Sequence, residues 1–275
     1  MKLIKGMFPD IIMKMQEGSN MMISLLLKIP QLKEHMPKEP YAGGKDNILK
    51  IILEILSLIG CLMYEFIKKL AYVFIITWIP WRVLGNLCPY IARQHNLTII
   101  YIYFILSTVC GTITNTTIFT MSGRDSFLLN TAGIKSSVYY FGRIIYRMLT
   151  DLFFGAAALA IVGLSGGQAF LLAAVTSLAR PVGEVAGLVI YSFFKKIHSK
   201  KAIYDGVIIA LAIITAYAFP YSFKKISPVW SNVTGPVAVA VTAVLSVMSL
   251  YVIWNYKRYG SIVRDLIFTK REDFN

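Results

Sequence analysis

Long apolar stretches recur along the chain, and they constrain its fold more than any other feature. A helix of about 20 apolar residues is long enough to cross a hydrocarbon layer of about 30 Å. We therefore predict an all-α fold, a polytopic helical membrane protein in which about six helices span the bilayer. The predicted spans are residues 70–92, 97–120, 144–164, 168–194, 203–220 and 236–254.

The distribution of charge orients these spans. The chain carries a net charge of +14, yet only 15% of its residues are charged, 56% are apolar, and the mean hydropathy is +0.62. Lys and Arg concentrate in alternate loops, as expected for segments that stay on the cytoplasmic side. This bias explains the positive charge without nucleic acid as a partner, and it predicts that both termini are cytoplasmic. The widely spaced cysteines indicate no disulfide framework.

The chain before the first span divides into two parts. Residues 1–45 alternate short apolar runs with Lys, Pro and Gly, which predicts an amphipathic segment lying at the cytoplasmic lipid surface. In residues 46–69 polar side chains recur every three or four positions, which predicts an amphipathic helix. Either this helix lies in the interface with its polar stripe facing water, or it is a further span with Glu54 and Glu65 facing the bundle interior. Residues 255–275 form a basic cytoplasmic tail.

Charged residues inside the predicted spans are the sharpest candidates for function. Arg180 and Glu184 lie one helical turn apart in a span, where an unpaired charge is costly, and their spacing allows them to pair. Pro181 beside them predicts a kink. The two charges either line a transport pathway or hinge, or form an ion pair that locks two helices. Arg82 in the first span is either a third member of this group or a residue that extends to the interface.

Residues 164–168 spell LSGGQ, the signature loop of ABC-type ATPases, but the rest of the chain argues against ATP binding. That loop works together with a phosphate-binding G-x-x-x-x-G-K-[ST] motif, which this sequence lacks. The histidines are scattered without the spacing of metal ligands, and no catalytic set is present in the sequence. We predict that the chain is not an enzyme and binds no cofactor or metal.

The longest polar interruption between two spans, residues 121–151, is predicted to be a cytoplasmic loop. It begins with an acidic and apolar run over 124–134, turns at Gly133, and enters the next span through aromatic and basic residues. The candidate contact residues are Arg124, Asp125, Phe127, Lys135, Tyr139, Tyr140 and Arg143. This pattern, with the number and orientation of the spans, resembles the permease subunit of an ABC-2-type ABC exporter.

The resemblance implies a transporter subunit without its own ATPase site. A separate ABC-type ATPase subunit would bind ATP and dock on the 122–143 loop. A second permease subunit, identical or related, would complete the pathway in the cell membrane of a bacterium, among membrane lipids. The outer segment 221–235 is shorter than is usual in that family, which puts a dedicated outer gate in doubt. The alternatives are another transporter or channel subunit, and a non-transport membrane module (immunity, scaffold or assembly subunit) that packs against another membrane protein.

Overall fold

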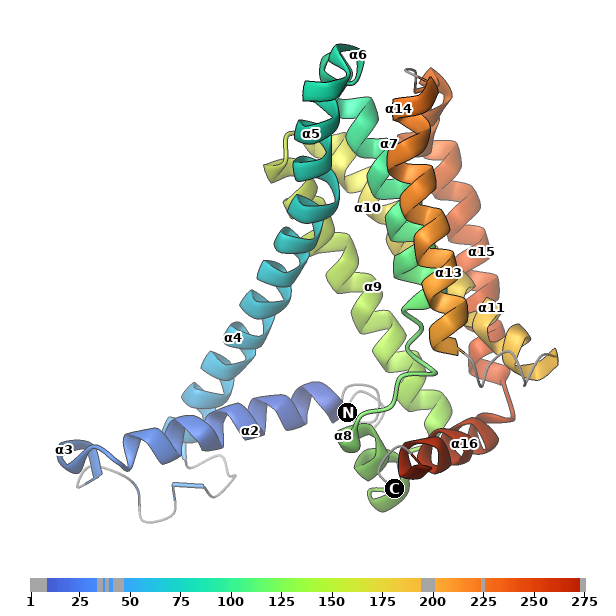
Figure 1. The fold of residues 1–275 in the computed structure, drawn as a ribbon. Helices are drawn as coiled ribbons and strands as arrows, with labels where there is room; N and C mark the ends of the chain where they lie inside the picture. Colours follow the sequence, from blue (N-terminus) through green and yellow to red (C-terminus); the bar gives the residue numbers. More distant parts are fainter. Residues whose placement is uncertain are drawn as a thin grey trace.

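The chain folds as a bundle of helices with two helices laid across one end. The computed structural model describes residues 9–33, 37, 40–41, 47–193, 201–223 and 226–272, and the side chains of all of these except 32, 33, 223 and 266–272. Every regular element within these residues is helical, and no strand occurs among them, which confirms that the fold is all-α. Figure 1 shows α2 (Pro9–Leu26) and α16 (Tyr259–Glu272) lying across one end of the bundle, hereafter the basal end; the opposite end is the distal end.

Five helices in the described part of the chain are long and apolar enough to cross a membrane. They are α7 (His95–Thr108) with the π-helix η2 (Val109–Thr114), α9 (Ser136–Ile161), α10 (Gly166–Leu178) with α11 (Arg180–Phe193), α13 (Lys201–Ile213) with the π-helix η4 (Ile214–Ala218) and α14 (Phe219–Phe223), and α15 (Pro236–Asn255). These helices match the predicted spans from 97–120 onward. α9 begins well before the predicted start at 144, so part of the predicted polar loop is helical.

The predicted span 70–92 belongs to a longer helix. α4 (Ile48–Val73), the π-helix η1 (Phe74–Trp78) and α5 (Ile79–Leu87) follow one another without a break. The interfacial helix and the span that we expected to meet near residue 70 are therefore one element. It tilts away from α9 toward the basal end (Figure 1), and it is not among the five apolar helices above. Asn47 caps its start by accepting the backbone N–H of Lys50 at 3.2 Å.

Proline kinks in two helices are compensated by hydroxyl groups from neighbours. Pro80 follows η1 and cannot bond the carbonyl of Ile76, one turn earlier. The Tyr217 hydroxyl donates to that carbonyl at 2.9 Å. In the same way, Tyr101 donates to the Thr215 carbonyl at 2.7 Å, within the π-helix η4 that ends just before Pro220. These contacts explain how the bundle accommodates both prolines.

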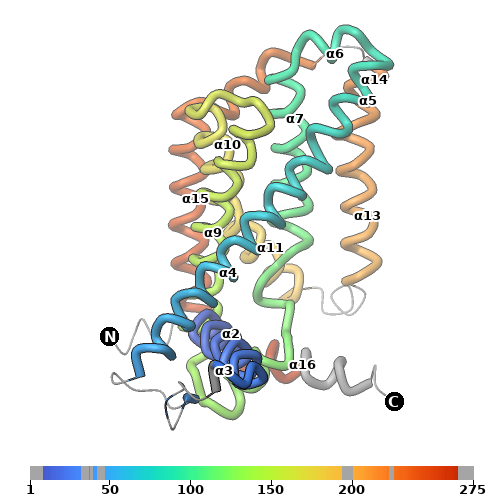
Figure 2. The backbone as a smooth tube through the Cα atoms, turned by 90° about the vertical axis from the view of Figure 1, so that its left-hand side faces the viewer, coloured from blue at the N-terminus to red at the C-terminus, as the bar shows by residue number. Residues whose placement is uncertain are grey.

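Two short connections close the distal end. α6 (Pro89–Arg93) links α5 to α7, and the 3-10 helix η5 (Pro228–Thr234) precedes α15. In Figure 2, α13 stands at one side of the bundle, next to α7. Most of the large apolar side chains of α13 and α15 are exposed, as expected for faces that meet lipid or another membrane helix.

At the basal end, α2 packs tightly against α4. Gly18 lies so close to Ser57 that a Cβ atom on Gly18 would overlap the Ser57 hydroxyl group. Lys50 is buried beneath α2, where its ammonium group donates to the Asn20 side chain. An amphipathic helix therefore occupies part of the predicted segment 1–45, while a short helix, α3 (Pro30–Lys33), follows it. The remaining structure of that segment lies outside the described residues, apart from isolated positions.

Gly183 allows α11 to approach the backbone of η2, and replacing it tests this contact. A Cβ atom on Gly183 would lie 2.1 Å from the Thr112 carbonyl oxygen, which is backbone and cannot move aside easily. We expect Gly183→Ala to lower the free energy of unfolding by about 1–3 kcal/mol, as overpacking usually does. Gly206→Ala is the matched control, because nothing lies within 4 Å of the position that its Cβ atom would take. Equal effects of both variants on unfolding in detergent would contradict the close approach.

Candidate functional site

A polar cavity of about 410 Å³ lies among α4, α7, α9 and α11, with α2 at its basal side. The basic side chains that line it are Lys14, Lys68, Lys69, Arg143, Arg147 and Arg180. The carboxylates that line it are Asp10, Glu65 and Asp151. Hydroxyl groups of tyrosine, serine and threonine complete the wall. A cavity with this much charge between apolar helices is the strongest candidate site in the described part of the chain.

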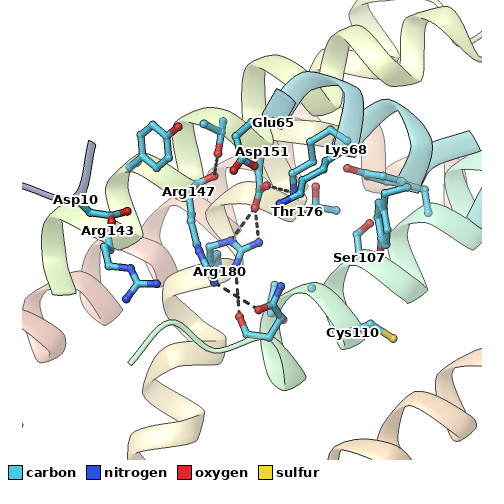
Figure 3. A pocket seen from close by; sticks show the side chains of 18 of the residues that line it. Asp10, Glu65, Lys68, Ser107, Cys110, Arg143, Arg147, Asp151, Thr176 and Arg180 are labelled. Carbon is cyan, nitrogen blue, oxygen red and sulfur yellow. Dashed lines mark hydrogen bonds and ion pairs between the residues drawn. The ribbon is translucent and has the colours of Figure 1, made fainter. Parts of the chain in front are cut away.

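Asp151 joins three helices at the centre of this cavity (Figure 3). Its carboxylate on α9 accepts from Arg180 on α11, at 2.7 Å from Nε and 2.5 Å from Nη2. Lys69 on α4 pairs with the other carboxylate oxygen. The Asp151 side chain is only 13% exposed, so both cations are needed to offset its loss of water.

Glu184 has a different role from the one expected, because it does not pair with Arg180. Its carboxylate is fully buried and accepts the backbone N–H groups of Thr117 and Ile118, the latter at 3.1 Å. Those amides belong to the segment after η2, where the chain leaves the helix before the predicted end of the span at 120. The expected ion pair within one turn is therefore wrong. Glu184 instead satisfies backbone donors that the unwound segment leaves without helical partners.

Arg82 does not join the cavity. Its guanidinium lies over the rings of Trp78 and Trp81, 5.2 and 5.1 Å from their centroids, on an exposed face of α5 toward the distal end. The interpretation in which Arg82 extends to the interface fits this placement better than a role beside Arg180. The helix is interrupted at Ala179, two residues before Pro181, where the sequence predicts a kink.

The predicted docking loop is a compact structure held by Asp125. Ser122 and Asp125 form a capping box at the start of α8 (Gly123–Ser126), which continues as the π-helix η3 (Phe127–Thr131). The buried Asp125 carboxylate also accepts from the Tyr139 hydroxyl at 2.5 Å and from Arg143 at 2.7 Å. These bonds tie the loop to the first turns of α9.

The seven predicted contact residues of this loop divide into internal and accessible ones. Tyr139 and Arg143 both donate to Asp125, and Tyr140 is buried against the Tyr259 ring of α16, 5.4 Å between centroids. Four of the seven thus stabilise the loop. Of the other three, Arg124 pairs with α2, while Phe127 and Lys135 are exposed.

The LSGGQ sequence forms a helix start at the distal end. Ser165 caps α10 by accepting the backbone N–H of Gln168 at 3.4 Å. Its hydroxyl group also bonds the Gln168 side chain at 3.1 Å. The distal position is opposite to the loop of residues 122–135 (Figure 1), and a helix cap accounts for the motif.

Sequence reasoning did not assign to a site the charged residues that surround Arg180 in the cavity, among them Lys69, Arg147 and Asp151. Arg147 and Asp151 lie where the predicted loop 121–151 overlaps the start of the predicted span 144–164, so their charges are compatible with a loop. The available signal was an ionisable residue within an apolar stretch, which indicates a functional or paired group. The signal for Lys69 was weaker, because this residue is the last of the predicted amphipathic helix 46–69, and the direction in which that helix faces depends on packing.

Loss of Asp151 should destabilise the bundle strongly. Asp151→Asn leaves Lys69 and Arg180 without a counter-charge, and breaking a buried pair from one side costs about 3–5 kcal/mol. Asp205→Asn is the control, since Asp205 pairs with Lys201 across one helical turn at 2.7 Å, an interaction worth about 0.5 kcal/mol. Denaturant unfolding in detergent measures both. Similar losses in the two variants would refute the central role of Asp151.

The stability contributed by Asp125 should depend on pH. Burial opposes ionisation of Asp125, but hydrogen bonds from Tyr139 and from the Ser122 backbone, with the charge of Arg143, outweigh it and lower its pKa. A carboxylate with a lowered folded pKa stabilises the protein above its unfolded value of about 3.9, and this contribution is lost as pH falls through the folded pKa. The difference in melting temperature between the native chain and Asp125→Asn should be constant from about pH 7 to about 5 and then shrink. A difference unchanged down to about pH 3 would contradict this.

Comparisons with known proteins found no match among models of protein families, curated proteins or solved structures. The resemblance of residues 121–151 to ABC-2-type permeases therefore stays a prediction from the sequence. The geometry itself defines two features: a basic cavity around Asp151, and a capped loop at the basal end that is bonded to α2 and α9.

Proposed function

We propose that this chain is the membrane-spanning permease subunit of an ATP-driven exporter. In this proposal the tilted helix 48–87 is a sixth span, the basal end faces the cytoplasm, and the protein lies in a bacterial plasma membrane. A separate ABC-type ATPase binds ATP and docks at the basal end, and a second permease subunit encloses the pathway. The structured loop of residues 122–135 is the observation that carries the proposal.

The loop has the properties that a docking element needs. Its backbone is held by the capping box and by the buried Asp125, so it can transmit force without unfolding. It also presents an apolar ring and a positive charge to a partner, because Phe127 is 49% exposed and Lys135 is exposed. A rigid element with an exposed aromatic anchor is a favourable surface for binding another protein.

The loop is connected to the helices around the cavity by two routes. Arg124 bonds Asp10 at 3.3 Å and Glu17 at 2.7 Å, which links the loop to α2 and, through it, to α4. The second route is direct, since Asp125 is bonded to the first turns of α9. A displacement of the loop by a motor subunit would therefore shift α4 and α9 relative to each other. Both helices line the cavity.

Substitutions at the exposed part of the loop test docking. Phe127→Ala combined with Lys135→Glu should reduce recovery of the ATPase by about tenfold or more, because the double variant removes the exposed ring and reverses the exposed charge. The loop should keep its structure, because these two side chains make no bond that holds it. Tyr221→Ala combined with Arg93→Glu is the matched control, with one half-exposed aromatic and one exposed cation at the distal end. The measurement is a mild-detergent pull-down from native membranes, followed by mass spectrometry.

Two outcomes of this pull-down would overturn the proposal. In the first, the native chain recovers another integral membrane protein and no ATPase with a P-loop. The chain is then a non-transport membrane module. If an ATPase is recovered equally with the loop variant and with the control, docking does not use residues 122–135. Unchanged melting temperatures of both variants would show that the fold is intact.

A further inference from the structure

The cavity around Asp151 contains more positive charge than its carboxylates neutralise. Lys69 and Arg180 share the single carboxylate of Asp151, which leaves one positive charge in excess. Lys14 is paired with Asp10 at 3.0 Å. The excess therefore lies deep in the cavity, next to Asp151, and not at its basal rim.

Arg147 adds a further positive charge at the same place and has no ion-pair partner there. Its guanidinium donates to neutral oxygens, Thr117 Oγ1 at 3.2 Å and Asn115 Oδ1 at 3.5 Å. Among the residues that the structure describes, no carboxylate lies within ion-pair distance of Arg147. Arg180 reaches the backbone carbonyl of the same Asn115 at 3.5 Å, so the two guanidinium groups meet at one residue. The fully buried carboxylate of Glu184 accepts the backbone N–H of the same Thr117. Three cations, Lys69, Arg147 and Arg180, therefore stand against two carboxylates, Asp151 and Glu184, and one positive charge is in excess. An anion bound beside Arg147 would offset this excess.

We propose that this cavity binds the phosphate group of an anionic ligand, held between Arg147 and the Arg180–Lys69 pair. A phosphate group is negatively charged at neutral pH and offers three acceptor oxygens, which suits a site with excess positive charge and several guanidinium and ammonium donors. Arg binds phosphate through two parallel hydrogen bonds. Tyr72, Tyr103 and Ser107 also line the cavity, and their hydroxyl groups can bond further ligand oxygens. The volume of about 410 Å³ holds a headgroup.

The ligand can be a soluble phosphate ester or the phosphate headgroup of a lipid. The cavity lies between α4 and α9, which diverge toward the basal end (Figure 1), and both sources present the same chemistry to Arg147. Lys68, on an exposed face of α4, also lines the cavity and has no ion-pair partner among the described residues. Glu65, on the same helix, lines the cavity as well and carries the opposite charge. Binding at this site requires no ATPase, so it can be tested apart from the proposed exporter function.

Binding of defined anions to the purified chain tests the site. The probes are inorganic phosphate, dioctanoyl phosphatidic acid and, as the zwitterionic control, dioctanoyl phosphatidylcholine, each titrated in a neutral detergent without any ATPase. Dissociation constants come from microscale thermophoresis. Arg147→Gln should weaken binding by about tenfold or more, because it removes a charge-assisted pair of hydrogen bonds. The glutamine can still donate to Thr117 or Asn115, so the fold is retained.

Two further variants keep the test independent of folding. Lys68→Gln, on an exposed face, should weaken binding several-fold without a change in melting temperature. Arg93→Gln at the distal end should bind like the native chain. Saturable binding of phosphate alone identifies a soluble ester, and binding of phosphatidic acid alone identifies a lipid headgroup. Binding of neither probe, equal binding of phosphatidylcholine, or an undiminished affinity of Arg147→Gln would overturn the proposal.

Discussion

The ion pairs of Asp151 with Lys69 and Arg180 are the interaction on which the arrangement of the bundle depends. Three helices, α4, α9 and α11, each contribute one of these charges, and none of the charges is stable alone in an apolar environment. Apolar helix faces can slide past one another with little change in energy, but a buried charge fixes one register. The same constraint creates the cavity, because side chains of this length hold the helices apart around a polar centre.

Two buried carboxylates, Glu184 and Asp125, accept hydrogen bonds from backbone amides. Glu184 accepts amides from the segment that follows η2, and Asp125 accepts the amide of Ser122 in its capping box. Each therefore stabilises chain that has left the helical state inside or beside the bundle. These hydrogen bonds hold the irregular segment between α7 and α9 in place.

The sequence predicted the helices of this fold better than it predicted which side chains pair between them. Apolar length placed five of the spans, because a helix that buries its backbone in lipid needs a minimum run of apolar residues. Residues 46–92 were divided incorrectly, since a polar stripe and a following apolar run can belong to one tilted helix. The pairing of Arg180 with Glu184 was also incorrect. Spacing along one helix indicates which of its side chains can pair, but it cannot predict a partner on another helix.

What the sequence by itself determined is the all-helical class, the polar loop before α9, and the presence of charges within apolar helices. Only the tertiary structure decided which of those charges meet. Asp151, Lys69 and Arg180 come from positions far apart in the chain, and long side chains such as Arg147 can point toward lipid, water or a neighbour from the same helix position. Their direction depends on helix rotation and tilt, which packing against several neighbours fixes together.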